Sequence, residues 1–184
     1  MGVCPNAPIP HTPYPHTPTL VLEENVIRVC FVCMGNICRS PLAEGVFKHL
    51  AAEAGAGKDF QIESFGIGAW HVGEDPDSRS QDVARAHGIR LTSRAQQFQP
   101  EDFPRFDHVL ALDETIASDL HRLATRDADR AKIRLLRAYD PWAEGNLNVP
   151  DPYYGDQQGF EVIYQMIYRA CRKLLKNLST EGAN

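Results

Sequence analysis

The sequence predicts an α/β fold: a doubly wound, four-stranded parallel sheet of the flavodoxin-like or Rossmann-like type, with helices on both faces. Apolar, β-branched segments of strand length alternate along the chain with segments whose apolar residues recur at helical spacing. The first of them, residues 26–33, is a hydrophobic run of the kind typical of a parallel strand buried on both faces. A loop and a helix start follow it directly. Parallel sheets bind ligands beyond the carboxyl ends of their strands, so we expect a site just after position 33.

The first helix is expected at residues 40–55, where apolar residues recur every four positions. Ser40 and Pro41 fit the N-cap and the first helical position, because a hydroxyl can cap free N–H groups and proline lacks one. Gly55 is expected to end this helix.

The rest of the chain repeats the strand and helix signals. The last helix carries its apolar residues on one stripe, as a helix packed on a sheet does. Further strands are predicted at 60–66, 107–113 and 132–136, and further helices near 80–88, at 114–124 and from Phe160 onward.

The domain organisation follows from composition. Residues 1–24 are rich in proline, which cannot join helix interiors or central strands, and contain the near-repeat "PHTPYPHTP". We expect a flexible N-terminal arm there, a single globular domain at 25–179 and a flexible tail at 180–184.

Charge and cysteine content exclude several function classes. A formal net charge of −5 gives no broad basic surface for nucleic acid, and no apolar run approaches the length of a membrane span. Three of the five cysteines crowd into positions 30–38, which is unlike a secreted disulfide framework and favours a reducing cytoplasm.

The segment "VCMGNICRSP", residues 32–41, is the clearest functional signal. It lacks the Gly-Lys-Ser/Thr of a nucleotide P-loop. Its backbone N–H groups would curl into a helix N-terminus, an arrangement that holds a tetrahedral oxyanion. Gly35 and Asn36 tolerate the positive φ that such a loop needs. The predicted phosphate-binding loop consists of Met34, Gly35, Asn36, Ile37, Cys38 and Ser40.

Cys33 and Arg39 give this loop a chemistry. A thiol beside a helix N-terminus and a cation is expected to react as a thiolate at neutral pH. The planar fork of Arg39 can grip two phosphoryl oxygens, and the Ser40 hydroxyl can donate to the sulfur. We therefore expect covalent phosphoryl transfer through a phosphocysteine.

The leaving oxygen needs a proton, and the loop holds no acid. Asp151, in "VPDPYYGD" beside Tyr153 and Tyr154, is the candidate general acid on another strand-end loop. An ordinary Asp-Pro turn is the simpler interpretation of that dipeptide alone.

Four segments together resemble the low-molecular-weight protein tyrosine phosphatase family, in matching order over about residues 26–178: "VCMGNICRSP", "GAWHVGEDPDSRSQ", "HVLALD" and "DPYYGDQQGFEVIY". The resemblance implies that Cys33 is the nucleophile, Arg39 the phosphate clamp and Asp151 the general acid. It implies supporting roles for Asn36 and Ser40. It also implies that an aromatic substrate is walled by Ile37, Trp70, Tyr153 and Tyr154.

The same resemblance implies phosphotyrosine-containing proteins as substrates, inorganic phosphate as product and inhibitor, and neither metal nor cofactor. The chain departs from the family at Ser93 and Gln96, where the family often has His and Arg. The family's His helps hold the loop Asn, so support for Asn36 from that side is an open question.

Several residues have two interpretations. Cys38 is either packing beneath the loop or a partner that forms a reversible disulfide with an oxidised Cys33, and the resemblance favours the disulfide. Trp70 is either pinned to the core or exposed for binding. Asp113 ends a strand and could cap the next helix, and His71 could shuttle protons. Cys30 and Cys171 are expected to be small buried hydrophobes.

Three other functions compete with tyrosine dephosphorylation. Arsenate reduction on this fold needs further cysteines downstream, and only Cys171 follows Cys38. Phosphoarginine hydrolysis is disfavoured by Ile37, since the resemblance implies a smaller polar residue there in phosphoarginine phosphatases. An anion-binding, redox-sensing module without catalysis is the non-enzyme alternative.

Overall fold

A parallel β-sheet forms the centre of the molecule in the computed structural model, which describes residues 26–181. The strand order is β2-β1-β3-β4, and every pairing is parallel. The predicted four-stranded parallel sheet is thus confirmed. The strands are β1 (Ile27–Cys33), β2 (Phe60–Gly66), β3 (His108–Ala111) and β4 (Ile133–Leu135).

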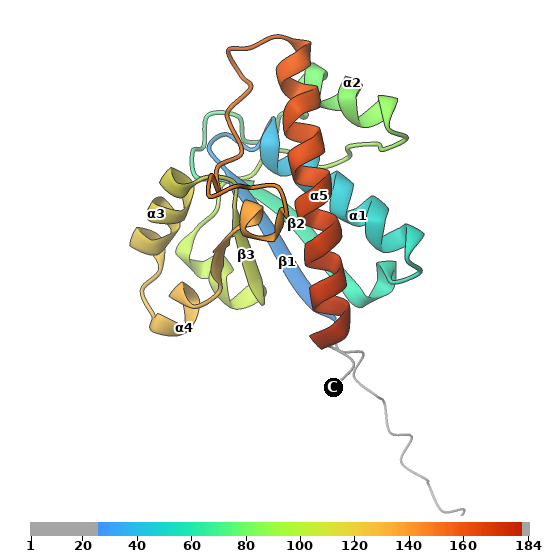
Figure 1. Ribbon diagram of the computed structural model, residues 1–184. Coiled ribbons are helices and arrows are strands. Elements are labelled where there is room, and N and C mark those ends of the chain that lie inside the picture. The colour runs from blue at the N-terminus through green and yellow to red at the C-terminus, as the bar shows by residue number, and fades with distance from the viewer. Residues whose placement is uncertain (1–25, 182–184) are drawn as a thin grey trace, which may run out of the picture.

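Helices cover both faces of this sheet (Figure 1). They are α1 (Arg39–Glu53), α2 (Ser78–Ala86), α3 (Glu114–Leu123), α4 (Asp127–Arg130) and α5 (Gln157–Glu181), with short 3₁₀ turns η1 (Gly57–Asp59), η2 (Pro100–Arg105) and η3 (Leu136–Tyr139).

Strand β1 is buried on both faces because its residues alternate between two cores. Phe31 and Cys33 belong to the core shared with α1 and α5. Cys30 and Val32 belong to the core shared with α3, on the opposite face. This double burial explains the apolar run in the sequence, and it confirms Cys30 as a small core residue.

The start of α1 differs from the prediction. The helix begins at Arg39 with Cys38 at the N-cap position, and no side chain caps it. Ser40 lies inside the first turn, where its hydroxyl contacts the Cys33 sulfur and the Phe65 carbonyl oxygen. The predicted Ser40 cap is therefore wrong, because other partners occupy that hydroxyl. Gly55 follows the helix with φ 71°, as a helix stop should.

Two further elements differ from the sequence prediction. Helix α5 begins at Gln157, three positions before the predicted Phe160, and α4 was not predicted because four residues carry no readable periodicity. The predicted N-terminal arm, residues 1–24, lies outside the described residues, as do residues 182–184 of the predicted tail.

Candidate active site

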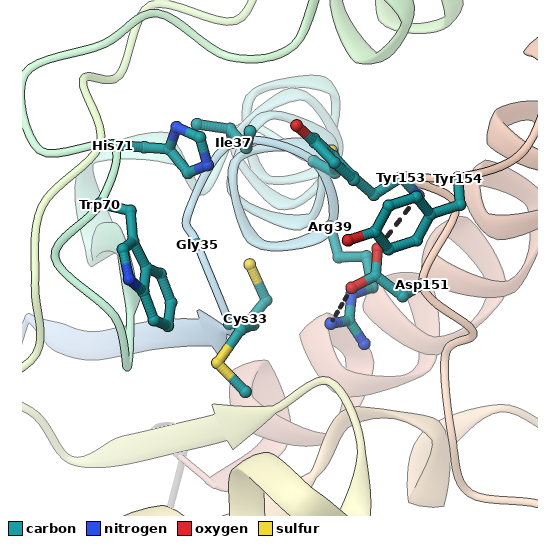
Figure 2. A pocket seen from close by; sticks show the side chains of 11 residues that line it. Cys33, Gly35, Ile37, Arg39, Trp70, His71, Asp151, Tyr153 and Tyr154 are labelled. Atoms are coloured by element: carbon teal, nitrogen blue, oxygen red, sulfur yellow. Dashed lines mark hydrogen bonds and ion pairs between the residues drawn. The ribbon is translucent and has the colours of Figure 1, made fainter.

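Cys33 ends β1 and lies at the bottom of a pocket formed by the loop that leads into α1 (Figure 2). Its side chain is buried among the loop residues, with 3% of the residue exposed. The sulfur lies 3.0 Å from the Ser40 hydroxyl and accepts a hydrogen bond from the Asn36 backbone N–H at 3.3 Å. These two contacts fix the position of the sulfur between the loop and the first turn of α1.

Asn36 has the left-handed backbone conformation that the sequence predicts, with φ 56°. Its side-chain amide donates to the hydroxyls of Ser40, at 2.8 Å, and Ser64, at 2.9 Å. Ser64 donates in turn to the buried carboxylate of Glu44 at 2.5 Å. This chain of hydrogen bonds ties the strained turn to β2 and α1 and fixes the hydroxyl beside Cys33.

Gly35 does not have a positive φ, so that part of the prediction is wrong. A Cβ atom at this position would lie 3.0 Å from the His71 ring, so a larger residue would require that side chain to move. Gly66, at the end of β2, faces the backbone of the loop instead. A Cβ there would lie 2.9 Å from the Met34 carbonyl oxygen, so only glycine lets the loop approach the strand this closely.

Asn36 is supported from the side of Ser93 and Gln96 although Ser93 itself does not hold it. The Gln96 backbone N–H donates to Asn36 Oδ1 at 2.8 Å, and the Gln96 side-chain amide donates to the Ser64 carbonyl oxygen at 3.0 Å. A backbone donor and Ser64 therefore hold the amide of Asn36 in this chain.

Arg39 is buried, with 3% of the residue exposed, and its guanidinium is held by two carboxylates. Nη1 donates to Asp113 Oδ2 at 2.5 Å and to the Val149 carbonyl oxygen at 3.1 Å, while Nη2 donates to Asp151 Oδ2 at 3.0 Å. Burial lowers the pKa of Arg39, but Cys33, Asp151 and Asp113 more than offset this, so the pKa lies above its ordinary value. The Arg39 guanidinium therefore stays protonated, and its hydrogen bonds fix its orientation.

Asp151 combines the two interpretations that the sequence left open. Its Oδ1 accepts the Tyr153 backbone N–H at 3.1 Å, which is a turn contact, while Oδ2 faces Arg39. The side chain is 49% exposed and lines the same pocket as Cys33 (Figure 2). The hydrogen bond within the turn therefore orients the Asp151 carboxylate toward Arg39 and the pocket.

Aromatic and apolar side chains wall the pocket, whose volume is about 280 Å³. Ile37 is nearly buried, whereas Trp70 is 70% exposed and Tyr154 is 96% exposed. Of the two interpretations of Trp70, exposure at the pocket rim is the observed one. The residues lining the pocket are Cys33, Met34, Gly35, Ile37, Cys38, Arg39, Trp70, His71, Asp151, Tyr153 and Tyr154.

The contact of Asp113 with Arg39 was not expected from the sequence, which indicated only a helix cap. Asp113 has two roles, since Oδ1 caps α3 at the Ile116 N–H and Oδ2 binds Arg39. The sequence indicated the helix cap, but local patterns could not predict the contact with Arg39, which is 74 positions away in the sequence. His71 lines the pocket, and its Nδ1 lies 2.8 Å from Glu74 Oε2.

The other cysteines have distinct environments. Cys38 is a buried residue of the loop itself, and burial, followed by Asp77, raises the pKa of its thiol to about 12. Cys171 is fully buried on α5, where burial raises its pKa, so it packs as a core residue.

Neither a metal centre nor a membrane span is found within residues 26–181. No three His, Cys, Asp or Glu side chains gather there in a way that could hold a metal ion. No helix in this range has the length and hydrophobicity to cross a bilayer.

Comparisons with known proteins agree with this geometry. Residues 28–184 match the family model of the low molecular weight phosphotyrosine protein phosphatases. A low molecular weight protein-tyrosine-phosphatase of Streptomyces coelicolor is 50% identical over 149 residues, covering 80% of this chain and 91% of the relative. The pig (Sus scrofa) phosphatase of the same description is 42% identical over 157 residues, 85% of this chain and 98% of its own.

Solved structures give the same result for the fold. A protein tyrosine phosphatase from Entamoeba histolytica superposes with a TM-score of 0.80 at 30% identity, covering 86% of this chain and 99% of its own. The structure of a Drosophila arginine phosphatase superposes with a TM-score of 0.77 at 31% identity, covering 83% and 98%. From its sequence, its fold and its cysteine loop, the chain belongs to the low molecular weight phosphotyrosine protein phosphatase family.

Proposed function

We propose that the protein hydrolyses phosphotyrosine in proteins through a phosphocysteine intermediate. The observation that carries the proposal is the meeting of Cys33, Arg39 and Asp151 around one pocket, although Asp151 lies more than a hundred positions beyond the loop. Each supplies a different requirement of the reaction: a nucleophile, a cation for the phosphoryl oxygens and a proton donor for the leaving group.

In the first step, the Cys33 sulfur attacks phosphorus and the bond between phosphorus and the tyrosine oxygen breaks. Arg39 binds the equatorial oxygens, and protonated Asp151 gives its proton to the leaving phenolate oxygen. In the second step, Asp151 takes a proton from a water molecule that attacks the phosphocysteine. Cys33 leaves as a thiolate and inorganic phosphate is released, so phosphate is expected to inhibit by occupying the same loop.

The walls of the pocket support an aryl substrate. Ile37 offers an apolar wall, and Trp70, Tyr153 and Tyr154 are flat side chains on either side of Cys33 that can pack against a phenyl ring. Because the Drosophila structural neighbour is an arginine phosphatase, phosphoarginine is the second candidate substrate. Ile37 favours tyrosine, because an apolar wall gives a charged guanidinium no partner.

The remaining alternatives lack support. Arsenate reduction would need an accessible downstream thiol, and Cys171 is fully buried. A silent redox-sensing module would have no use for Asp151 beside Arg39. We also propose a cytoplasmic location and redox regulation, on the basis of the cysteine content and the Cys33 and Cys38 pair.

The proposal is tested by hydrolysis of a small aryl phosphate and by trapping the intermediate. The parent should turn over the substrate and, after rapid acid quenching, carry phosphate on the Cys33 peptide. Cys33→Ser should lose both, whereas Cys171→Ala, which removes a different buried thiol, should keep both. Turnover by Cys33→Ser at the parent rate would refute the proposed mechanism.

A further inference from the structure

A second hollow lies away from the phosphatase pocket, between the segment that follows η3 and the C-terminal half of α5. Its volume is about 480 Å³, and none of its lining residues lines the first pocket. It is lined by Pro141, Trp142, Arg169, Arg172, Lys173 and Lys176. The lining therefore contains four cations and no carboxylate, in a chain whose net charge is −5.

Trp142 is held in place although it is 68% exposed. The buried carboxylate of Asp140 accepts the Trp142 backbone N–H at 3.0 Å and also binds the Arg169 guanidinium, at 2.9 and 3.0 Å. The Arg169 guanidinium carbon lies 4.7 Å from the centre of the Trp142 ring. A large aromatic side chain fixed in an exposed position is typical of a binding surface.

The other three cations have no such partner. Arg169 is paired with Asp140, but Arg172, Lys173 and Lys176 are exposed, and none of them has an ion-pair partner within residues 26–181. Arg172 and Lys176 are four residues apart on α5 and so lie on one side of the helix. The hollow thus presents about three uncompensated positive charges beside an aromatic ring.

We propose that this site binds an acidic peptide segment of a partner protein. Its carboxylates would pair with Arg172, Lys173 and Lys176, and an apolar or aromatic side chain would pack against Trp142. Charge complementarity requires an anionic occupant. A hollow suits a peptide chain better than a bilayer, whose surface contacts flat or protruding faces, and three free cations are few for a nucleic-acid backbone.

The experiment measures binding of a fluorescein-labelled dodecapeptide that contains six glutamates and one central phenylalanine, by fluorescence anisotropy at low and high salt. It carries no phosphate, so its binding does not depend on the phosphatase activity. The full-length parent should bind it at low salt and release it as salt increases. Arg172→Glu combined with Lys176→Glu should weaken binding by about tenfold or more.

The control variant combines Lys58→Glu with Arg90→Glu, two exposed cations on other parts of the surface. It changes the net charge by the same amount and also removes one arginine and one lysine, so its affinity should stay within about twofold of the parent. Equal loss of binding in both variants would refute the site, because the attraction would then depend only on overall charge.

Trp142→Ala tests the aromatic contact without changing any charge. It should weaken binding by roughly threefold to tenfold, and replacing the peptide's phenylalanine by alanine should add no further loss in this variant. All variants should keep the parent's rate on a small aryl phosphate, which shows that they fold. No peptide binding, together with binding to vesicles containing phosphatidylserine that the Arg172→Glu, Lys176→Glu variant loses, would overturn the proposal in favour of a membrane surface.

Discussion

The Arg39 guanidinium and the Asp151 carboxylate are bonded to each other across 3.0 Å, so the predicted phosphate clamp and the predicted acid share one hydrogen bond. A phosphoryl group bound by Arg39 competes for the same donor. The other anchor of Arg39, Asp113, lies on the far side of the guanidinium at the start of α3 and keeps the fork in position. Substrate binding and release of the acid are therefore coupled through one nitrogen atom.

Asp151→Asn should slow hydrolysis of substrates with poor leaving groups by about 10²- to 10⁴-fold, because the amide cannot supply the proton. Asparagine can still accept the Tyr153 N–H, so the turn is preserved. A series of aryl phosphates whose leaving groups differ in pKa checks this, and the loss should shrink as the leaving group becomes more acidic. A uniform loss across the series would exclude Asp151 as the general acid.

Phosphotyrosine peptides should be hydrolysed with a kcat/KM at least about tenfold above that of matched phosphoarginine peptides. The reason is the apolar wall at Ile37 and the aromatic rim, which stabilise a phenyl ring and leave a guanidinium without partners. Steady-state kinetics on peptides that differ only at the phosphorylated residue measure the ratio. A preference for phosphoarginine would overturn the substrate assignment and leave the phosphocysteine mechanism intact.

Limited peroxide should inactivate the enzyme reversibly through a Cys33–Cys38 disulfide. Peroxide oxidises Cys33 to a sulfenic acid, and the Cys38 sulfur displaces hydroxide from it, which leaves as water. Because burial and Asp77 raise the pKa of Cys38 to about 12, its thiolate fraction rises about tenfold per pH unit between pH 6 and 8. Disulfide formation after a peroxide pulse should accelerate accordingly.

Peptide mapping and recovery of activity with a dithiol measure this reaction, with Cys38→Ser as the control. The parent should recover fully, whereas the variant should lose activity irreversibly as Cys33 oxidises further. If the two recover equally and no linked peptide is found, Cys38 serves only to pack the loop.

Asn36 should show separate backbone and side-chain effects. Asn36→Ala loses the amide contacts to Ser40 and Ser64 and also strains a backbone with φ 56°. Asn36→Gly loses the same contacts without the strain, so it should be more stable than the alanine variant by about 1 kcal/mol in denaturant unfolding. Both should be less active than the parent. Equal stability would mean that the left-handed turn relaxes when the side chain is removed.

Asp140→Asn should destabilise the fold by about 3 kcal/mol at neutral pH, because it leaves the buried Arg137 and the partly buried Arg169 without a carboxylate. Burial raises the pKa of Asp140, but hydrogen bonds from Arg169 and the Trp142 N–H outweigh this, so the pKa lies below its ordinary value. The carboxylate thus stabilises the fold above about pH 4 and loses this effect as pH falls through its lower folded pKa.

Unfolding measured between pH 7 and pH 3 checks this, and the difference between parent and variant should narrow toward the acid end. A difference that is constant with pH would show that the Asp140 charge is not its source. Asp59→Asn is a suitable control, since this exposed carboxylate has neither an ion pair nor a hydrogen bond within residues 26–181.

The strands and most helices were predictable because burial on both faces of a parallel sheet leaves apolar runs, and helices on that sheet need one apolar stripe. The position of the loop that holds Cys33 was predictable because β1 was recognisable and ligands bind beyond the carboxyl ends of parallel strands. The start of α1 was mispredicted because local rules expect the Ser40 hydroxyl to cap the N–H groups of the helix. In the structure, this hydroxyl contacts the Cys33 sulfur and the Phe65 carbonyl oxygen instead.

The supporting residues of the site could not be predicted from local patterns. Strand register pairs Cys33 with Gly66, and this places Ser64 two residues back on β2, within reach of Asn36. Glu44 and Asp113 act from helix and strand-end positions that look like ordinary surface or capping residues in the sequence. Trp142 belongs to a loop without periodicity, so only the structure shows that it is exposed and fixed.

Helix α5 sets the distance between the phosphatase pocket and the basic hollow at Arg172. It begins just after the Tyr153 and Tyr154 loop, and Arg172 lies fifteen positions after its first residue, Gln157, about 22 Å along the axis. An extended peptide needs at least about seven residues to span that length. A partner that occupied both sites at once would therefore be selected by the spacing between its phosphotyrosine and its acidic segment, because the length of α5 fixes the separation of the two sites.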